Sequence, residues 1–338
     1  MTIPLFSVPY LVLAEVFNHI PTAEIIALSL CSKKSSRVIE MLRKKPRNPK
    51  LKIFKRKRMG FVFENKDFIK IYPYFQARKK VIKQIQRNIP CEFDKSDFHG
   101  PCLQLFWTDS VHLNKLLIEY ACDRFNAPVS DIIISVTDGL WVIDWVNEWQ
   151  RGVPVENVKV NIIDKISDEE YFRFLRCNAT KYLYIAAQAP KNFQLDVLPN
   201  VEDLTLRSCH WITLEHLLTM EVKNLSALKT RLTSSDVNTF LKHWLAGGSP
   251  RLRYINLQIE NFSMDAVIQG FEEKLYLVER PRQYKRHLRE PIFTFNEGHD
   301  ITRDDGMRAT LVHSAGVAHG YSTMIFVVWP NINGHSFV

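Results

Sequence analysis

The sequence contains no run of about 18 apolar residues, so it predicts no membrane-spanning helix. Its apolar N-terminus has no basic segment ahead of it and is interrupted by Glu15, so we expect no cleaved signal peptide. None of the six cysteines forms a Cys-x-x-Cys pair, and none has the spacing of zinc ligands. We therefore expect reduced, mostly buried thiols in a cytoplasmic and/or nuclear protein without a metal site.

Sequence motifs of the common catalytic centres are missing as well. There is no Gly-x-x-x-x-Gly-Lys phosphate loop, no Gly-x-Ser-x-Gly nucleophile turn and no His-Glu-x-x-His zinc motif. Five histidines lie late in the chain without ligand spacing, namely His287, His299, His313, His319 and His335. The sequence therefore predicts no catalytic residue, no cofactor and no enzymatic activity of its own.

The composition is nevertheless that of a folded protein. With 338 residues, of which 46% are hydrophobic and 12% aromatic, the chain is long enough for one large or two medium domains. Its positive charge is uneven: residues 1–100 hold 21 Lys and Arg against 8 Asp and Glu, a net charge of +13, whereas the remainder carries −4 of the total of +9. The excess is centred on residues 43–58, where ten of sixteen residues are basic.

This basic run has two interpretations. It can bind an anionic surface such as nucleic acid, anionic lipid or an acidic protein. It can equally be a solvated linker and edge strand that its charge keeps soluble, which is the interpretation we favour. The candidate residues for anionic-surface binding are Arg43, Lys44, Lys45, Lys55, Arg56, Lys57 and Arg58.

The first forty residues predict three short helices. Apolar residues from Leu13 to Ile20 recur at steps of three and four, Pro9 precedes this segment and Pro21 ends it. Two further apolar helical faces follow, around Ile25 and around Val38. Helices this short cannot bury a core alone, so we expect them to need a partner surface.

This N-terminal pattern, with its Leu-Ser-Leu-Cys-Ser-Lys-Lys segment, resembles an F-box over residues 3–43. In that family such residues dock on the Skp-type adaptor of a cullin-RING (SCF) ubiquitin ligase. Many F-boxes carry Trp or another large residue after the Lys, and here Ser35 and Ser36 follow. The resemblance implies the adaptor-binding residues Pro9, Leu13, Val16, Phe17, Ile20, Ile25, Leu28, Leu30 and Val38.

A repeat begins further along the chain. The pattern apolar-x-x-apolar-x-apolar occurs six times, with middle positions at 132, 158, 183, 204, 225 and 255 and spacings of 26, 25, 21, 21 and 30 residues. Leucine-rich repeats have periods of about 20–29 residues, and the stretch from Val201 to Cys209 fits their pattern throughout. Stacked strand-plus-helix units would bury their apolar faces in a curved solenoid. The alternative is a non-repetitive α/β domain with coincidental spacing.

Helices are predicted around and between these strands, over residues 109–125, 140–150, 171–175, 214–220 and 237–245. Ser167 and Glu170 have the spacing of a capping box ahead of one of them. Trp141, Trp145 and Trp149 recur at i, i+4 and i+8. Such a stripe is either the core face of a helix, which we favour, or a protein-binding patch.

Strand patterns flank the repeat on both sides. Residues 51–54 and 61–63 predict two short strands around Gly60. Residues 292–295, 309–313 and 324–329 predict a small antiparallel sheet that caps the solenoid.

The stretches LTLRSCHWITLEHLL, LTSSDVNTFLKHWLAGGSPRLRYINL and HDITRDDGMRATL are similar to the type 2 F-box-associated domain of nematode F-box proteins. The similarity covers residues from about 130 to 330. In that family this domain is taken to be the substrate-binding part.

Together these resemblances predict an α/β protein in four parts: an F-box (3–43), a linker with the N-terminal part of the associated domain (44–128), a leucine-rich-repeat-like substrate-recognition domain (129–270) and a β-rich cap (271–338). The implied function is that of a non-catalytic substrate-recognition subunit of an SCF-type E3 ubiquitin ligase. Its partners would be a Skp-type adaptor, a cullin scaffold and an unidentified target protein. The alternative is a basic nucleic-acid-binding protein that uses the run 43–58, with binding that weakens steeply with salt.

Overall fold

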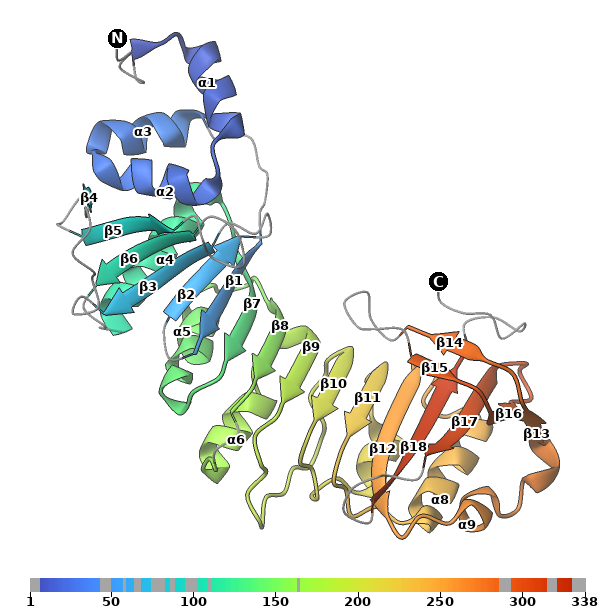
Figure 1. The fold of residues 1–338 in the computed structure, drawn as a ribbon. Coiled ribbons are helices and arrows are strands. Elements are labelled where there is room, and N and C mark those ends of the chain that lie inside the picture. Colours follow the sequence, from blue (N-terminus) through green and yellow to red (C-terminus); the bar gives the residue numbers. More distant parts are fainter. Residues whose placement is uncertain are drawn as a thin grey trace. The chain divides into compact units, whose positions relative to one another are not determined.

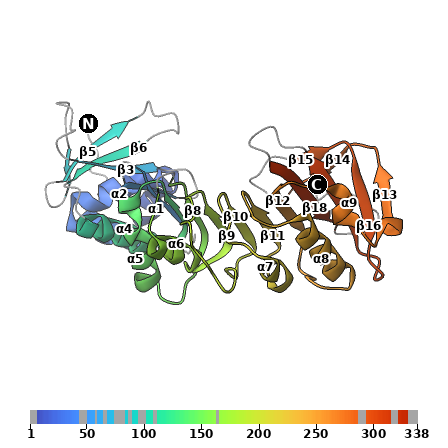
Figure 2. The same ribbon diagram turned by 90° about the horizontal axis from the view of Figure 1, so that it is seen from below.

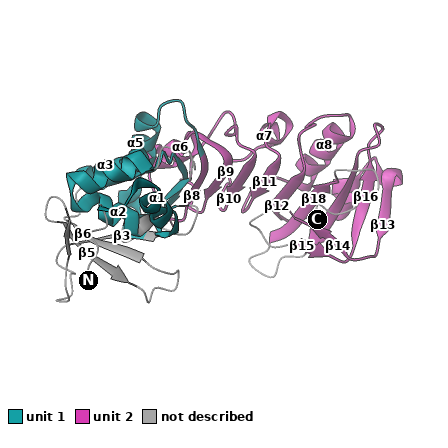
Figure 3. Ribbon diagram, turned by 90° about the horizontal axis from the view of Figure 1, so that it is seen from above, with its two compact units in different colours: residues 1–155 teal, residues 156–338 magenta. Residues whose placement is uncertain are grey.

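The computed structural model describes residues 7–42, 50–56, 59–63, 68–73, 83–85, 89–94, 102–107, 111–162, 165–285, 293–314 and 321–329. The chain divides into two compact units, residues 1–155 and residues 156–338, which have different colours in Figure 3. Both units combine a sheet with helices, so the α/β class expected from the sequence is confirmed. The domain boundaries expected at 128/129 and 270/271 stay predictions.

The described helices of unit 1 are α1 (Tyr10–His19), α2 (Thr22–Cys31), α3 (Lys33–Leu42), α4 (Val111–Phe125) and α5 (Trp141–Trp149). Pro9 and Pro21 occupy the positions immediately before α1 and α2, each with a φ of −55°. A proline is tolerated there because it replaces no intrahelical donor. The Ser32 hydroxyl starts α3 by accepting a hydrogen bond from the Ser35 backbone N–H at 3.0 Å.

Helix α4 supplies part of the partner surface that the N-terminal helices need. The Tyr120 hydroxyl on α4 donates to the Ser29 hydroxyl at 2.9 Å and lies 3.4 Å from the hydroxyl of Ser36. One turn further along α4, Arg124 forms an ion pair with Glu40 of α3. Ser36 therefore lies at a close helix–helix contact within the chain, where a tryptophan-sized side chain would not fit without displacing Tyr120.

The sheet of unit 1 has the strand order β7-β1-β2-β3-β6-β5-β4 among the described residues (Figure 1). Strand β1 pairs in antiparallel fashion with β2, as the two predicted short strands require, and in parallel fashion with β7. Gly60 lies opposite Phe54 in the β1–β2 register, and a Cβ atom at Gly60 would come within 2.3 Å of the Phe54 ring. Glycine is thus required where the Phe54 ring covers the neighbouring strand. The strands are β1 (Leu51–Lys55), β2 (Met59–Phe63), β3 (Phe68–Pro73), β4 (Lys83–Ile85), β5 (Ile89–Asp94), β6 (Cys102–Trp107) and β7 (Val129–Ile134).

The main sheet of unit 2 has the order β13-β16-β17-β18-β12-β11-β10-β9-β8. Strands β9, β10, β11 and β12 are parallel to one another, whereas β18 is antiparallel to β12. The strands expected near 155–160, 180–185, 201–206, 222–227 and 252–257 coincide with β8 to β12. These are β8 (Val155–Val160), β9 (Ala179–Ile185), β10 (Asp203–Leu206), β11 (Asn224–Ala227), β12 (Tyr254–Glu260), β13 (Leu275–Val278), β16 (Gly298–Thr302), β17 (Arg308–Ser314) and β18 (Tyr321–Val328).

The two faces of this sheet are covered differently. The Trp244 ring of helix α8 lies 5.0 Å from the ring of Phe326 on β18, so Phe326 marks the helix side. The neighbouring residues of β18 point to the other side, where the two-stranded sheet of β14 (Arg282–Tyr284) and β15 (Phe293–Phe295) lies (Figure 2). The described helices of unit 2 are α6 (Asp168–Leu175), α7 (Leu214–Thr219), α8 (Ser234–Leu245) and α9 (Met264–Ile268).

The predicted C-terminal sheet differs from expectation in two respects. Its strands are present as β15, β17 and β18, and β17 pairs with β18 in antiparallel fashion as expected, but β15 pairs with β14 in a separate two-stranded sheet. However, β18 pairs with β12 over seven residue pairs, so β16, β17 and β18 extend the parallel strands instead of forming a separate cap. The physical reason is that β12 runs on to Glu260 and leaves an edge that β18 fills.

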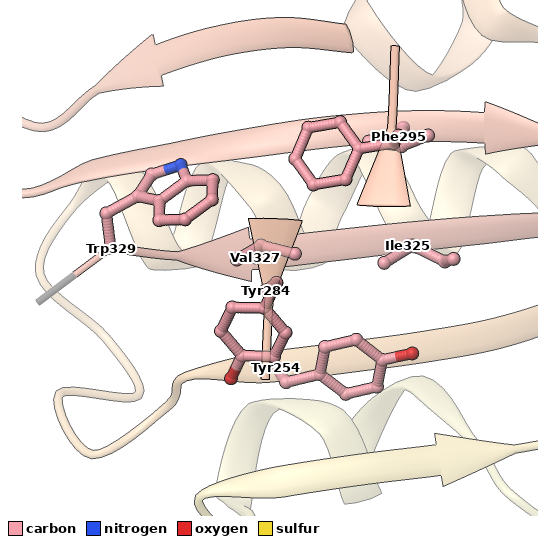
Figure 4. Close-up of a cluster of buried hydrophobic side chains, with 7 residues drawn as sticks. Tyr254, Tyr284, Phe295, Ile325, Val327 and Trp329 are labelled. Atoms are coloured by element: carbon pink, nitrogen blue, oxygen red, sulfur yellow. The ribbon is translucent and has the colours of Figure 1, made fainter. Parts of the chain in front are cut away.

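An aromatic cluster lies between β14–β15 and the main sheet (Figure 4). The rings of Tyr254 and Tyr284 stack with centroids 5.5 Å apart and an interplanar angle of 6°. The Trp329 ring meets Tyr284 edge-on at 6.1 Å. Buried aromatic rings thus pack the two-stranded sheet against the main sheet, in addition to the short β14–β15 strand pairing that holds its own strands together. The cluster consists of Tyr254, Tyr284, Phe295, Val312, Ile325, Val327 and Trp329.

The predicted capping box at the start of α6 is present. The Glu170 backbone N–H donates to the Ser167 hydroxyl at 3.2 Å, and the Ser167 backbone N–H donates to the Glu170 carboxylate at 2.8 Å. We expect Ser167→Ala to lower the free energy of unfolding by about 1 kcal/mol, because it leaves a helix N-terminal N–H without its acceptor. Denaturant unfolding monitored by circular dichroism measures this change. A loss as small as that of an exposed surface substitution would contradict it.

Candidate protein-interaction surfaces

The outer face of helix α1 is the first candidate. Leu11 is 80% exposed and Val12 is 50% exposed, and Tyr10 and Val16 are exposed beside them. Four large apolar side chains are thus exposed on one ten-residue helix, which is typical of a protein-interaction site. We call these four residues the α1 patch.

The residues expected to bind the adaptor fall into three groups. Pro9 and Val16 are exposed, and Ile20, Leu28 and Val38 are half-buried. Leu13, Phe17, Ile25 and Leu30 are buried inside the chain and form the inner faces of the helices. Leu11, Val12 and Tyr10 were missed by the sequence analysis, because the 3.6-residue period marks the apolar stripe of α1 but not the apolar residues beside it.

One of the basic residues that the sequence suggests for an anion-binding surface is buried. Lys55 is only 4% exposed, and its Nζ lies 3.1 Å from the Asp138 carboxylate. It cannot contribute to an anion-binding surface in this position, because it is the last of the alternate residues of β1 whose side chains are buried. Strand β1 lies between β7 and β2 in the sheet. Arg56 is exposed. The other candidates, Arg43, Lys44, Lys45, Lys57 and Arg58, lie outside the described residues.

The tryptophan stripe of α5 is a row of adjacent rings. The ring centroids are 5.8 Å apart between Trp141 and Trp145 and 5.7 Å apart between Trp145 and Trp149. Trp145 is buried and its Nε1 donates to Glu119 of α4 at 3.0 Å, while Lys115 Nζ lies 5.5 Å from the Trp141 ring. Trp141 and Trp149 are only half-buried, so the core interpretation holds for Trp145 alone. The other buried residues of α5 are Val142, Ile143 and Val146.

The second candidate is the face of β9–β12 that is turned away from the helices. In register, Tyr182, Asp203, Asn224 and Tyr254 form one row across the four strands. Tyr184, Thr205, Ser226 and Asn256 form the next row. Alternation places these residues opposite the apolar Leu183, Leu204, Leu225 and Ile255. We call the two rows the polar strand face; its hydroxyl, amide and carboxylate groups can form hydrogen bonds. Five of its residues are largely buried, namely Asp203, Thr205, Asn224, Ser226 and Tyr254.

The described part of the chain holds no group of three or more His, Cys, Asp or Glu residues that could bind a metal ion. His216 is buried, and its Nε2 lies 2.7 Å from the Leu195 carbonyl, so it is a structural side chain. His313 stacks on Phe262 with centroids 4.2 Å apart, and burial lowers its pKa. His299 lies in β16, whereas His287, His319 and His335 lie outside the described residues.

Across the described residues, every helix is too short or too polar to cross a membrane.

Cysteine reactivity provides a test of the burial pattern. Cys31 is exposed, whereas Cys122, Cys177 and Cys209 are buried. Burial raises the pKa of the Cys177 thiol to about 12 and also raises the pKa of Cys122 and Cys209. Because the thiolate is the reactive form, we expect maleimide at pH 8 to label Cys31 first among these four. Time-resolved peptide mass mapping measures the order, and labelling of Cys177 as fast as Cys31 would contradict it.

Comparison with known families matches two parts of the chain. Residues 5–47 match the F-box domain, and residues 192–257 match the F-box associated family. The first match contains α1, α2 and α3 with the α1 patch, and the second contains β10, β11 and most of the polar strand face.

Three curated proteins of Caenorhabditis elegans are similar to the chain. The Skn-1 dependent zygotic transcript 15 protein is 21% identical over 186 residues, which cover 52% of this chain and 54% of that protein. Two uncharacterized proteins are 23% and 25% identical over 175 and 170 residues, covering 50% and 47% of this chain and 38% and 36% of theirs. The chain thus spans about half or less of the length of these relatives. No solved structure shows a significant match.

The two family matches define the class of protein: an F-box domain and an F-box associated region lie in one chain. Together with the Caenorhabditis elegans relatives, they support a nematode-type F-box protein with a type 2 F-box-associated region.

Proposed function

We propose that this protein is a substrate-recognition subunit of an SCF-type ubiquitin ligase. The observation that carries the proposal is the α1 patch, four exposed apolar side chains inside the segment that matches the F-box domain. Burying such a patch on a Skp-type adaptor would remove it from water, which is the main driving force of protein association. The cullin scaffold would join through that adaptor.

The target would bind unit 2, and the polar strand face is the surface we assign to it. We further propose that β8 to β12 with their helices form a leucine-rich-repeat-like solenoid, in line with strand spacings of 25, 21, 21 and 30 residues at the middle positions. Catalysis in this scheme is proximity, since the chain would hold a target near a ubiquitin-loaded partner and form no covalent intermediate itself. The cytoplasm and/or the nucleus are the compartments that such a role implies.

The nucleic-acid alternative loses support from the described residues. Lys55, one of its seven candidate residues, is buried against Asp138. Steep weakening with salt would be expected of such binding.

The proposal is tested by co-expression of the full chain with a Skp-type adaptor, followed by size-exclusion chromatography. We expect the two proteins to elute together as a complex. Separate elution of a folded chain and a folded adaptor would overturn the proposed function.

A further inference from the structure

The edge strand β13 of unit 2 exposes two large apolar side chains. Tyr276 is 64% exposed and Leu277 is 58% exposed. They point to opposite faces of the sheet, because successive side chains of a strand alternate. Among the described residues of unit 2, Val197 is the one other large apolar side chain with comparable exposure. Two of these three residues are therefore neighbours on a single four-residue strand.

Strand β13 also ends the main sheet of unit 2 (Figure 2). In the described part of the chain it pairs with β16 on one side and with no strand on the other. Alternate residues of an antiparallel strand direct their N–H and C=O groups to opposite sides, so half of these groups in β13 point outward. Proteins commonly protect such an edge with a proline or a charged side chain in the strand. The sequence of β13, Leu-Tyr-Leu-Val, contains neither.

On the helix side of the sheet, β13 carries the last member of an apolar row. The strand register leads from Ile255 through Phe326, Leu311 and His299 to Leu277. The first three side chains are at most 1% exposed, whereas Leu277 at the end of the row is largely exposed. A further strand with an apolar residue opposite Leu277 would bury this side chain and continue the row.

One carboxylate beside the N-terminal end of β13 lacks a counter-charge. Glu272 has Lys242 as a nearby cation, and Lys274 Nζ lies 3.3 Å from Asp304 Oδ1. Glu273 is exposed and forms no ion pair within the described residues. The two residues that follow the strand are one acid and one base, which balance each other. A basic residue in a binding partner would therefore complement the charge at the Glu273 end.

We infer that β13 binds an extended segment of the target, which adds a strand to the outer edge of the sheet. The segment carries an apolar residue opposite Leu277 and a Lys or Arg beside Glu273. This inference rests on the proposed function and gives unit 2 a contact with the target in addition to the polar strand face. In strand addition the backbone hydrogen bonds supply affinity, and side chains at alternate positions supply specificity.

A second copy of the chain fits this edge less well. A stable dimer buries about 20–30 residues on each side, and β13 offers four. A symmetric antiparallel pairing centred on Tyr276 would place Glu273 opposite Glu279 of the other copy. A pairing centred on the next residue would place Lys274 opposite Arg280. Like charges directly opposite one another destabilise a strand pair, so the geometry favours a target segment.

The test uses the full chain and a phage-displayed library of random nonapeptides. The wild-type chain is expected to select peptides with apolar residues at alternate positions and a Lys or Arg at one end. Tyr276→Ser with Leu277→Ser should weaken binding of a selected peptide at least about tenfold, and both positions are exposed, so the fold is retained. Val197→Ser, a matched change of an exposed apolar residue elsewhere in unit 2, should leave binding unchanged. Glu273→Lys should shift the selection at that end from basic to acidic residues.

Methylation of the peptide backbone tests strand addition on the wild-type chain and does not depend on the folding of any variant. An N-methyl group on an amide that points to β13 removes a hydrogen-bond donor and occupies its place, whereas on the next residue it points away. We expect a scan of single N-methyl substitutions to weaken binding at least about tenfold at alternate positions and little at the positions between them. Fluorescence anisotropy of the labelled peptide measures each affinity.

Selection of no peptide, an N-methyl scan without alternation, or undiminished binding by the folded serine variant would each overturn the inference. A concentration-dependent dimer that the serine variant abolishes, measured by light scattering after size-exclusion chromatography, would also overturn it, because a second copy would then occupy the edge. Adaptor co-elution is measured on the same proteins and should be unaffected by the β13 variants. Its failure would contradict the proposed function, whereas failed peptide selection with intact co-elution would contradict strand addition alone.

Discussion

Substitution of Leu11 and Val12 by aspartate is expected to abolish binding of a Skp-type adaptor while leaving the chain folded. Leu11 is 80% exposed and Val12 is 50% exposed, so charges there remain in water in the free chain and change its stability little. In the complex the same carboxylates would be buried without partners, at several kcal/mol each. We expect affinity to fall by at least about a hundredfold. Isothermal titration calorimetry with the purified adaptor measures the affinity, and near-ultraviolet circular dichroism reports the fold.

A matched control keeps this experiment specific. Val197 is 69% exposed in unit 2, and Val197→Asp should leave adaptor affinity unchanged. Leu13→Asp with Phe17→Asp is not informative, because both side chains are buried and the charges would unfold α1 itself. Wild-type affinity of the Leu11→Asp, Val12→Asp chain would show that the α1 patch is not the adaptor site.

Local signals in the sequence predicted the element positions well, because their causes are local. Prolines at 9 and 21 fix where two helices begin, and the Ser167–Glu170 spacing fixes the start of a third. The prediction for α8 started at residue 237, three residues late. Its cap is Thr233, whose hydroxyl accepts from the Asp236 backbone N–H, and Asp in place of Glu at that position disguised the capping box.

Burial was harder to predict, since it depends on which elements become neighbours. Lys55 looks like part of a basic run in the sequence. In the fold it follows Leu51 and Ile53 on the buried side of a strand that has β7 on one side and β2 on the other. Only the parallel pairing of β1 with β7, a contact between residues more than seventy positions apart, brings the chain around Asp138 to Lys55. Because basic residues occupy both buried and exposed positions of β1, the sequence did not show the alternation of buried and exposed side chains in this strand.

The same limit applies to the surfaces proposed for binding. The apolar period of α1 marked Leu13 and Phe17, and these residues do face inward. The exposed Leu11 and Val12 stand out only once the inner face is known. Likewise, the repeat pattern located Leu204, Leu225 and Ile255, while the polar residues between them formed a surface only when the strands were placed in register.

The largest stability effect is expected at a buried ion pair in unit 2. Arg282 Nη1 lies 2.8 Å from Asp300 Oδ1, and both side chains are largely withdrawn from water. The Thr310 hydroxyl donates to Asp300 at 2.6 Å and accepts from Arg282 Nη1 and from Trp329 Nε1. Nε and Nη2 of Arg282 have no acceptor, so the Asp300 carboxylate is the principal compensation for this cation.

Asp300→Ala is therefore expected to lower the free energy of unfolding by about 3–5 kcal/mol, because it leaves the guanidinium buried without its counter-charge. The double change Arg282→Met with Asp300→Leu should recover most of that loss, since it removes both charges and adds apolar surface to the cluster around Trp329. Asp304→Ala, which breaks the exposed Lys274–Asp304 pair, should change stability by less than about 1 kcal/mol. Urea unfolding of the three variants measures these differences. A double variant as unstable as Asp300→Ala would show that the pair itself, and not the uncompensated charge, holds β14 on the sheet.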